Sequence, residues 1–153
     1  IRTPILNNPE QLRTIMYSVL KQIKKVEVIE ARHLVNSTII NDNSILLQVY
    51  RPFSVLNTVG LSSVEKSEKI ENKVRIYTSK LTALLPEGFE VGNKKLCFRV
   101  TTVSGQRFLI GTDKRPYPIV TFNENYPNSP STRCGSTMTV TYSNTIPMLL
   151  QLD

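Results

Sequence analysis

Residues that could support catalysis are few and lie far apart in the sequence. His33 is the only histidine, and Cys97 and Cys134 are the only cysteines. A Ser–His or Cys–His catalytic pair needs that histidine, as do most catalytic zinc sites. Neither cysteine lies in a Cys-x-x-Cys motif, and two cysteines do not make a disulfide framework. We therefore expect a structural or surface histidine and two reduced thiols, although the sequence is also compatible with one bridge.

Two segments contain the residue types of anion-binding loops without the required spacing. Gly111–Lys114 lacks the glycine-rich spacing that precedes the helix of a phosphate-binding loop. Arg133–Thr137 places a thiol near an arginine and a Gly-Ser turn, but the arrangement differs from that of cysteine phosphatases. A distant carboxylate pair of the glycosidase type is a minor alternative among only 12 acidic residues. The sequence therefore predicts a protein that is not an enzyme and has no metal and no cofactor.

The charge balance favours an acidic partner. The chain has 153 residues and a formal net charge of +7, which is compatible with nucleic acid, an anionic membrane or an acidic protein surface. The densest basic cluster, a candidate basic patch, consists of Lys21, Lys24 and Lys25. It lacks the interleaved aromatic residues on which single-strand binders stack bases, so we expect at most weak, non-specific contact with nucleic acid. No apolar run approaches the length that spans a bilayer, and no membrane partner is expected.

The N-terminal region has the pattern of an amphipathic helix over Pro9–Lys24. Asn8 is a favourable N-cap, and proline suits the first helical position. The apolar residues recur at helical spacing, in one stripe that we expect to pack on a sheet rather than on a membrane surface: Leu12, Ile15, Met16, Val19, Leu20 and Ile23.

Strand patterns follow this predicted helix. Val26–Val35 and Ile45–Tyr50 predict a hairpin with a long loop, whose tip is Asn41–Asn43. Ser62 and Glu65 have the spacing of a capping box, and the mixed charges that follow suit an exposed helix. Gly60–Asn72 is therefore predicted to be a short helix or a charged loop, and Lys73–Leu81 a strand.

The C-terminal half has the clearest strand patterns. Leu96–Val100 alternates in the manner of a sheet with one buried face, and Ser104-Gly105 is a turn. The predicted strands are Leu96–Val103, Arg107–Ile110, Ile119–Phe122 and Thr137–Tyr142, with a polar loop at Asn123–Gly135. Residues 1–153 are therefore predicted to form one α+β domain that is mostly β, with an N-terminal helix packed on a mainly antiparallel sheet.

A resemblance to a known group of proteins is carried by four stretches of the C-terminal part: Phe98–Gly105, Phe108–Thr112, Arg115–Pro118 and Thr137–Tyr142. Together they resemble small virion-associated proteins encoded in the structural gene clusters of tailed bacteriophages and prophages. The resemblance implies a structural subunit in the tail or the neck of a particle, located in the virion. It implies multi-copy assembly, with copies of itself and other virion proteins as partners, and no catalytic residues.

Surface features suggest where such contacts would lie. Edge strands offer unpaired backbone groups, and long polar loops suit contacts with neighbours. The candidate assembly contacts lie in two extended segments that contain prolines: Arg115, Pro116, Tyr117 and Pro118, and then Asn125, Tyr126 and Arg133. The alternatives are a basic nucleic-acid-binding or adaptor module, a small enzyme with an unrecognised site, and a ligand-binding or cell-surface domain.

The nucleic-acid alternative predicts a salt dependence. If nucleic acid is the partner, binding should weaken steeply as salt rises, because bound lysines release counterions from the phosphates. We expect only weak binding of duplex DNA, reduced further when Lys21, Lys24 and Lys25 are all replaced by alanine. Fluorescence anisotropy over a range of salt concentrations measures both effects. Tight binding at physiological salt, lost in the triple variant, would favour the nucleic-acid module over the virion subunit.

Overall fold

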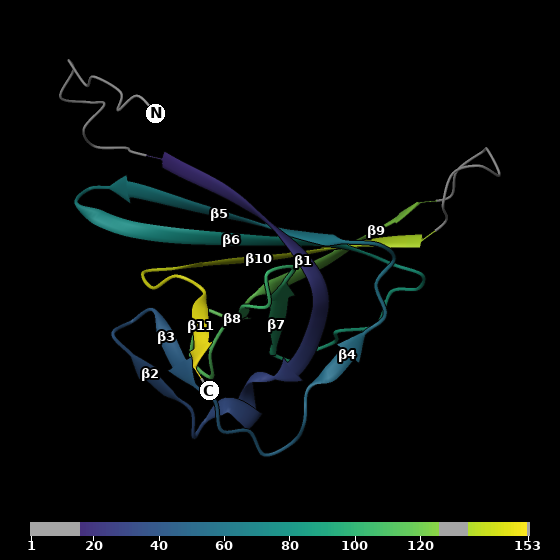
Figure 1. The fold of residues 1–153 in the computed structure, drawn as a ribbon, viewed down its shortest axis with the longest axis horizontal. Helices are drawn as coiled ribbons and strands as arrows, with labels where there is room; N and C mark the ends of the chain where they lie inside the picture. The colour runs from purple at the N-terminus through teal and green to yellow at the C-terminus, as the bar shows by residue number, and fades with distance from the viewer. Residues whose placement is uncertain (1–15, 126–134, 153) are drawn as a thin grey trace.

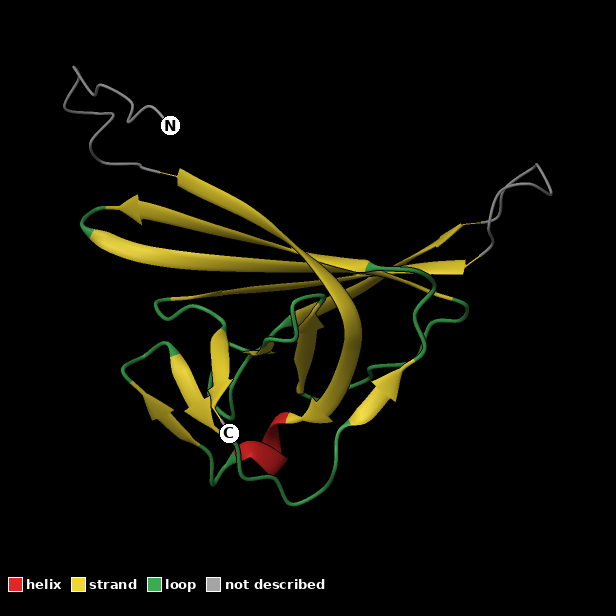
Figure 2. Ribbon diagram, viewed as in Figure 1, coloured by secondary structure: helices red, strands yellow, loops and turns green. Residues whose placement is uncertain are grey.

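The computed structural model describes residues 16–125 and 135–152, and these form one sheet of eleven strands with a short 3-10 helix (Figures 1 and 2). The elements are β1 Met16–Glu30, η1 Ala31–Leu34, β2 Thr38–Ile40, β3 Ser44–Leu46, β4 Ser54–Leu56, β5 Ser62–Glu71, β6 Val74–Leu85, β7 Leu96–Thr102, β8 Arg107–Ile110, β9 Ile119–Asn125, β10 Gly135–Asn144 and β11 Leu149–Leu152.

The strands follow the order β2-β3-β11-β8-β7-β1-β5-β6-β10-β9, with β4 also paired to β1. Every pair is antiparallel except β3–β11, which is parallel. The prediction of a mostly β protein with a mainly antiparallel sheet is therefore confirmed.

Strand β1 belongs to both halves of this sheet. Its first part, Met16–Ile23, pairs with β5, and its second part, Ile23–Glu30, pairs with β7. In Figure 1, β1 leaves the layer of β5, β6 and β10 and curves down into the region of β7. The sheet therefore folds over itself with β1 as the shared strand.

A β-bulge at Lys24 marks the point where β1 changes layers. The register against β7 shifts between Ile23 and Lys25, so one extra residue is inserted there. Such a residue increases the local bend and twist of a strand. It also lets two consecutive residues, Lys24 and Lys25, lie exposed between the fully buried Ile23 and Val26.

The main core fills the space between the two layers. Strands β5, β6 and β10 contribute one wall, and β7, β8 and the second half of β1 contribute the other. Its largest fully buried side chains are Ile23, Val26, Val64, Leu81, Phe98, Val100, Ile110, Met138 and Met148.

A smaller core covers the opposite face of β7 and β8. Its buried residues are Ile29, Ala31, Leu34, Ile45, Cys97, Leu109 and Leu149, and Phe53 and Tyr117 pack against them. Both faces of this part of the sheet are thus covered, which explains why β7 is buried along nearly its whole length.

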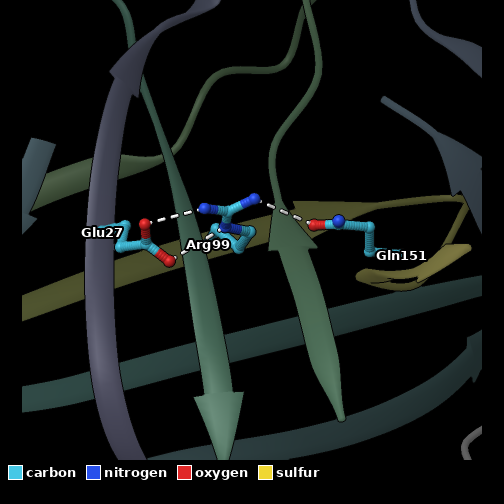
Figure 3. Close-up of polar contacts among 3 residues, drawn as sticks. All are labelled: Glu27, Arg99 and Gln151. Atoms are coloured by element: carbon cyan, nitrogen blue, oxygen red, sulfur yellow. Dashed lines mark hydrogen bonds and ion pairs between the residues drawn. The ribbon is translucent and has the colours of Figure 1, made fainter. Parts of the chain in front are cut away.

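Glu27 and Arg99 form a largely buried ion pair (Figure 3). Each is two residues from a member of the second core, Ile29 in β1 and Cys97 in β7, so the pair lies on the same face. Glu27 and Arg99 stand directly opposite each other in the β1–β7 pair. Arg99 donates from Nε to Glu27 Oε1 at 2.9 Å and from Nη2 to Oε2 at 2.7 Å. Its Nη1 donates to Gln151 of β11 at 3.2 Å, and its guanidinium lies 4.0 Å from the centre of the Phe53 ring. One side chain therefore joins three strands and the segment before β4.

The β5–β6 hairpin extends beyond the core as an arm. Its turn at Asn72 and Lys73 has positive φ at both residues, 51° and 68°, the backbone that a two-residue hairpin turn requires. Glu65–Thr78 is intermediate or exposed throughout. Because neither face of this stretch enters the core, its sequence does not alternate between apolar and polar residues.

Three predictions of local structure are wrong. Met16–Lys24 belongs to β1 rather than to a helix, while residues 9–15 of the predicted helix lie outside the described residues. Ser62–Glu71 is strand β5 rather than a helix or loop. Ile45–Tyr50 does not pair with Val26–Val35, because β3 pairs with β2 and β11.

Several other predictions are confirmed. Arg107–Ile110 is β8, and the strands predicted at 73–81, 96–103, 119–122 and 137–142 correspond to β6, β7, β9 and β10 with small shifts of their ends. A turn is present at Asn41–Asn43 as predicted, with positive φ at Asn41 and Asp42, but it joins β2 to β3 rather than the two strands that were predicted to pair. Gly105, at φ 95°, makes the tight turn between β7 and β8.

Replacing Glu27 by alanine should destabilise the fold strongly. Arg99 would keep its charge in a buried site without a carboxylate, which costs about 3 kcal/mol in free energy of unfolding. The double replacement Glu27→Leu with Arg99→Met removes both charges, and its free energy of unfolding should lie within about 1 kcal/mol of the parent value. Urea unfolding followed by circular dichroism measures both. Equal losses in the single and double variants would show that packing, rather than the unpaired charge, determines the effect.

Candidate functional site

The Arg115–Pro118 segment connects β8 to β9 and is anchored on the second core. Arg115 and Pro116 are exposed and joined by a cis peptide bond, whereas Tyr117 and Pro118 are half-buried. The Tyr117 hydroxyl donates to the carbonyl of Asp113 at 3.2 Å, and Lys95 Nζ lies 5.8 Å from the ring centre. A Cβ at Gly111, which has a φ of 97°, would lie 2.7 Å from Pro118. Contacts of Tyr117 and Pro118 therefore anchor the segment, while Arg115 and Pro116 are exposed to solvent.

Strand β9 continues from this segment and forms an edge of the sheet. It pairs with β10 from Ile119 to Asn125 without a shift of register, and no other described strand lies beside it. The strand contains no proline, and Ile119 is 65% exposed. Protected edges usually carry a proline, a bulge or a covering segment; among the described residues, the outer backbone of β9 pairs with no other strand.

The predicted assembly contacts are placed at the two ends of β9. Arg115–Pro118 lies directly before its first residue, and Asn125 is its last residue. Tyr126 and Arg133 lie outside the described residues. The structure therefore connects Arg115–Pro118 and Asn125 through seven residues of edge strand.

The three lysines of the predicted basic patch differ in their surroundings. Lys24 and Lys25 are exposed at the bulge of β1. Lys21 is half-buried, two residues before the fully buried Ile23, and its Nζ lies 5.1 Å from the centre of the Phe108 ring. Nothing in the spacing of Lys21, Lys24 and Lys25 indicated a contact of Lys21 with Phe108, or its proximity to Lys66, whose Nζ lies 5.8 Å from the same ring. The alternation Lys21–Ile23 at strand spacing is the signal that could have indicated this inward position.

Two of the candidate catalytic residues, His33 and Cys97, lie within the described part of the chain. His33 is in η1, and its backbone carbonyl accepts a hydrogen bond from the Tyr50 amide at 3.4 Å. Cys97 is buried, and its thiol donates to the carbonyl of Thr112 at 3.3 Å. Burial, together with the charge of Asp113, raises the pKa of the Cys97 thiol to about 12. Cys134 lies outside the described residues, and within the described ranges no three His, Cys, Asp or Glu side chains are grouped as metal ligands would be.

No family model, curated protein or solved structure matches the chain. Among the described residues, no helix has the length and apolar character needed to cross a membrane.

Cys97 should resist alkylation while the protein is folded. With the pKa raised from 9.0 to about 12, the thiolate fraction at pH 8 falls about a thousandfold, and the thiolate is the reactive form. In a Cys134→Ser background, iodoacetamide should label Cys97 only after denaturation, as measured by intact-mass spectrometry. Labelling at similar rates with and without denaturant would contradict the buried position of this thiol.

Proposed function

We propose that the protein is a structural subunit of a tailed-bacteriophage particle, in the tail or neck region, where many copies pack around an axis. The observation that carries the proposal is the open edge of β9, bounded by the anchored Arg115–Pro118 segment and by Asn125. In the virion its partners are copies of itself and other particle proteins.

An open sheet edge suits repeated assembly. Strand addition supplies backbone hydrogen bonds that do not depend on side-chain identity, and a heterologous contact repeated around an axis closes into a ring. Closure covers each edge with a neighbouring copy, and this removes the risk of uncontrolled pairing that a lone edge carries.

The resemblance to virion-associated proteins supports the same function. Its four stretches correspond to β7, β8, the segment before β9, and β10. Strand β10 is the partner of β9, and the segment before β9 is one of the candidate contacts. Two of the four stretches, β10 and the segment before β9, therefore adjoin the edge on which the proposal rests, whereas β7 and β8 lie elsewhere in the strand order.

The nucleic-acid alternative has less support. A non-specific binder gains affinity from several lysines along one backbone track. Lys24 and Lys25 are exposed, but Lys21 is directed over Phe108. Two exposed lysines on a bulge provide only a short track.

Particles purified from the natural source should contain this chain in many copies. Cryo-electron microscopy should place it in a ring or tube of the tail or neck, with β9 next to a strand of a neighbouring subunit. A chain found free of any large assembly and bound to a small molecule would contradict the proposal.

Two neighbouring proline substitutions provide a matched control for the edge. Consecutive residues of a strand direct their amides to opposite sides, so Val120→Pro and Thr121→Pro remove one amide facing β10 and one facing outward. The variant that loses the outward-facing amide should have the melting temperature of the parent and still fail to enter particles. Incorporation of both variants at the parent level would exclude β9 as the contact.

A further inference from the structure

A pocket of about 440 Å³ lies where the arm meets the turn before β11. Its volume falls in the lower part of the range of roughly 300–1,000 Å³ typical of ligand pockets. Its lining comes from β1, β5, β6 and the β10–β11 turn and includes Lys21, Lys66, Glu68, Tyr77, Ser79 and Pro147. Lys66 pairs across the strands with Ser79, and Glu68 with Tyr77, so these four side chains share the face of the arm that continues from the main core.

Two lysines that line this pocket place their ammonium groups near one aromatic ring. Lys21 Nζ and Lys66 Nζ lie 5.1 and 5.8 Å from the centre of the same Phe108 ring, which is 8% exposed. Within the described part of the chain, neither lysine forms an ion pair, and Glu68 is paired with Arg75 at 3.4 Å. Burial and then the charge of Lys21 lower the pKa of Lys66, with partial opposition from Glu68. The ring attracts both cations, and Glu68 offsets part of their mutual repulsion. An added anion between the two ammonium groups would relieve the rest.

Beside these lysines, the first part of β1 offers backbone groups that are unpaired among the described residues. Residues 16–21 pair with β5 on one side, while pairing with β7 begins only at Ile23. The other side of this stretch therefore faces no described strand. An extended peptide that adds there would pass next to Lys21.

We propose that this pocket binds the carboxylate of an acidic segment from a partner protein, held by Lys21 and Lys66 while Tyr77 and Pro147 contact an adjoining apolar side chain. Charge complementarity to a chain of net charge +7 favours an acidic partner over another copy. Apolar atoms form most of the lining, which suits a carboxylate next to an aromatic or aliphatic residue.

A peptide fits these features better than a nucleic acid. Nucleic acids bind through several phosphates along a basic groove, with bases stacked on aromatic rings. This pocket offers one anion position, Glu68 would repel a second phosphate, and neither Lys24 nor Lys25 lines it. Phe108 is covered by the lysines and is not free to stack on a base.

The test is a titration of the full chain with acetyl-Phe-Glu-amide, followed by nuclear magnetic resonance of the lysine side chains and the Phe108 ring. The signals of Lys21, Lys66 and Phe108 should shift saturably, and acetyl-Phe-Gln-amide should bind about tenfold more weakly. Lys21→Gln and Lys66→Gln should each weaken binding about tenfold, because each loses a charge-assisted contact. Lys66→Arg keeps the charge and should bind within about threefold of the parent. Lys25→Gln, which removes an equal charge from the same strand, should bind like the parent.

Melting temperatures of all variants establish that losses are not due to unfolding. Absence of saturable shifts would overturn the proposal, as would an equal loss in Lys25→Gln, which would indicate general charge attraction. Tighter binding of inorganic phosphate or of a single-stranded oligonucleotide, dependent on Lys21 and Lys66, would also overturn it and indicate a nucleic-acid ligand. None of these outcomes depends on whether the protein is part of a phage particle.

Discussion

The bend of β1 at Lys24 is the constraint on which both layers of the sheet depend. A strand without a bulge presents alternate residues to each face, so Ile23 and Val26 could not both face the main core. The extra residue restores the inward position of Val26, while β1 passes from pairing with β5 to pairing with β7. Directly after the bulge, Glu27 is fixed by Arg99, and Arg99 in turn contacts Gln151 and Phe53. The backbone irregularity and the ion pair thus orient the same short stretch of β1.

The helix was predicted because Met16, Val19, Leu20 and Ile23 recur at helical spacing. The pairing of Met16–Ile23 with β5, between residues far apart in the chain, makes this stretch a strand instead. Strand β5 was missed for a different reason: Glu65, Lys66, Glu68 and Lys69 lie on an arm outside the core, where charge pairs at helical spacing replace apolar alternation. By contrast, β7, β8 and β10 were predicted because their alternation, turns and β-branched residues all indicate the same structure.

The candidate contacts could be predicted only in part. Proline spacing indicated the extended Arg115–Pro118 segment, but its support by Gly111 and Tyr117 depends on contacts across the second core. The pocket on the arm could not be predicted, because Lys21, Lys66 and Phe108 are brought together by pairing that spans most of the chain. The folding of the sheet places Lys21 away from its sequence neighbours Lys24 and Lys25. The same folding brings Lys21 near Lys66, which is distant in the sequence.

During synthesis, β1 is completed long before its partner strand β7. Its last residue, Glu30, is made 72 residues before Thr102, the end of β7, because 102 − 30 = 72. At about 5–20 residues per second, β1 waits roughly 4–14 s on the ribosome before its second partner exists. During this interval Ile23, Val26 and Ile29 lack the core residues that β7 and β8 contribute. Lys21, Lys24 and Lys25 then act as gatekeeper charges of the kind that flank unavoidable apolar strands, because their repulsion opposes pairing between β1 strands of neighbouring nascent chains.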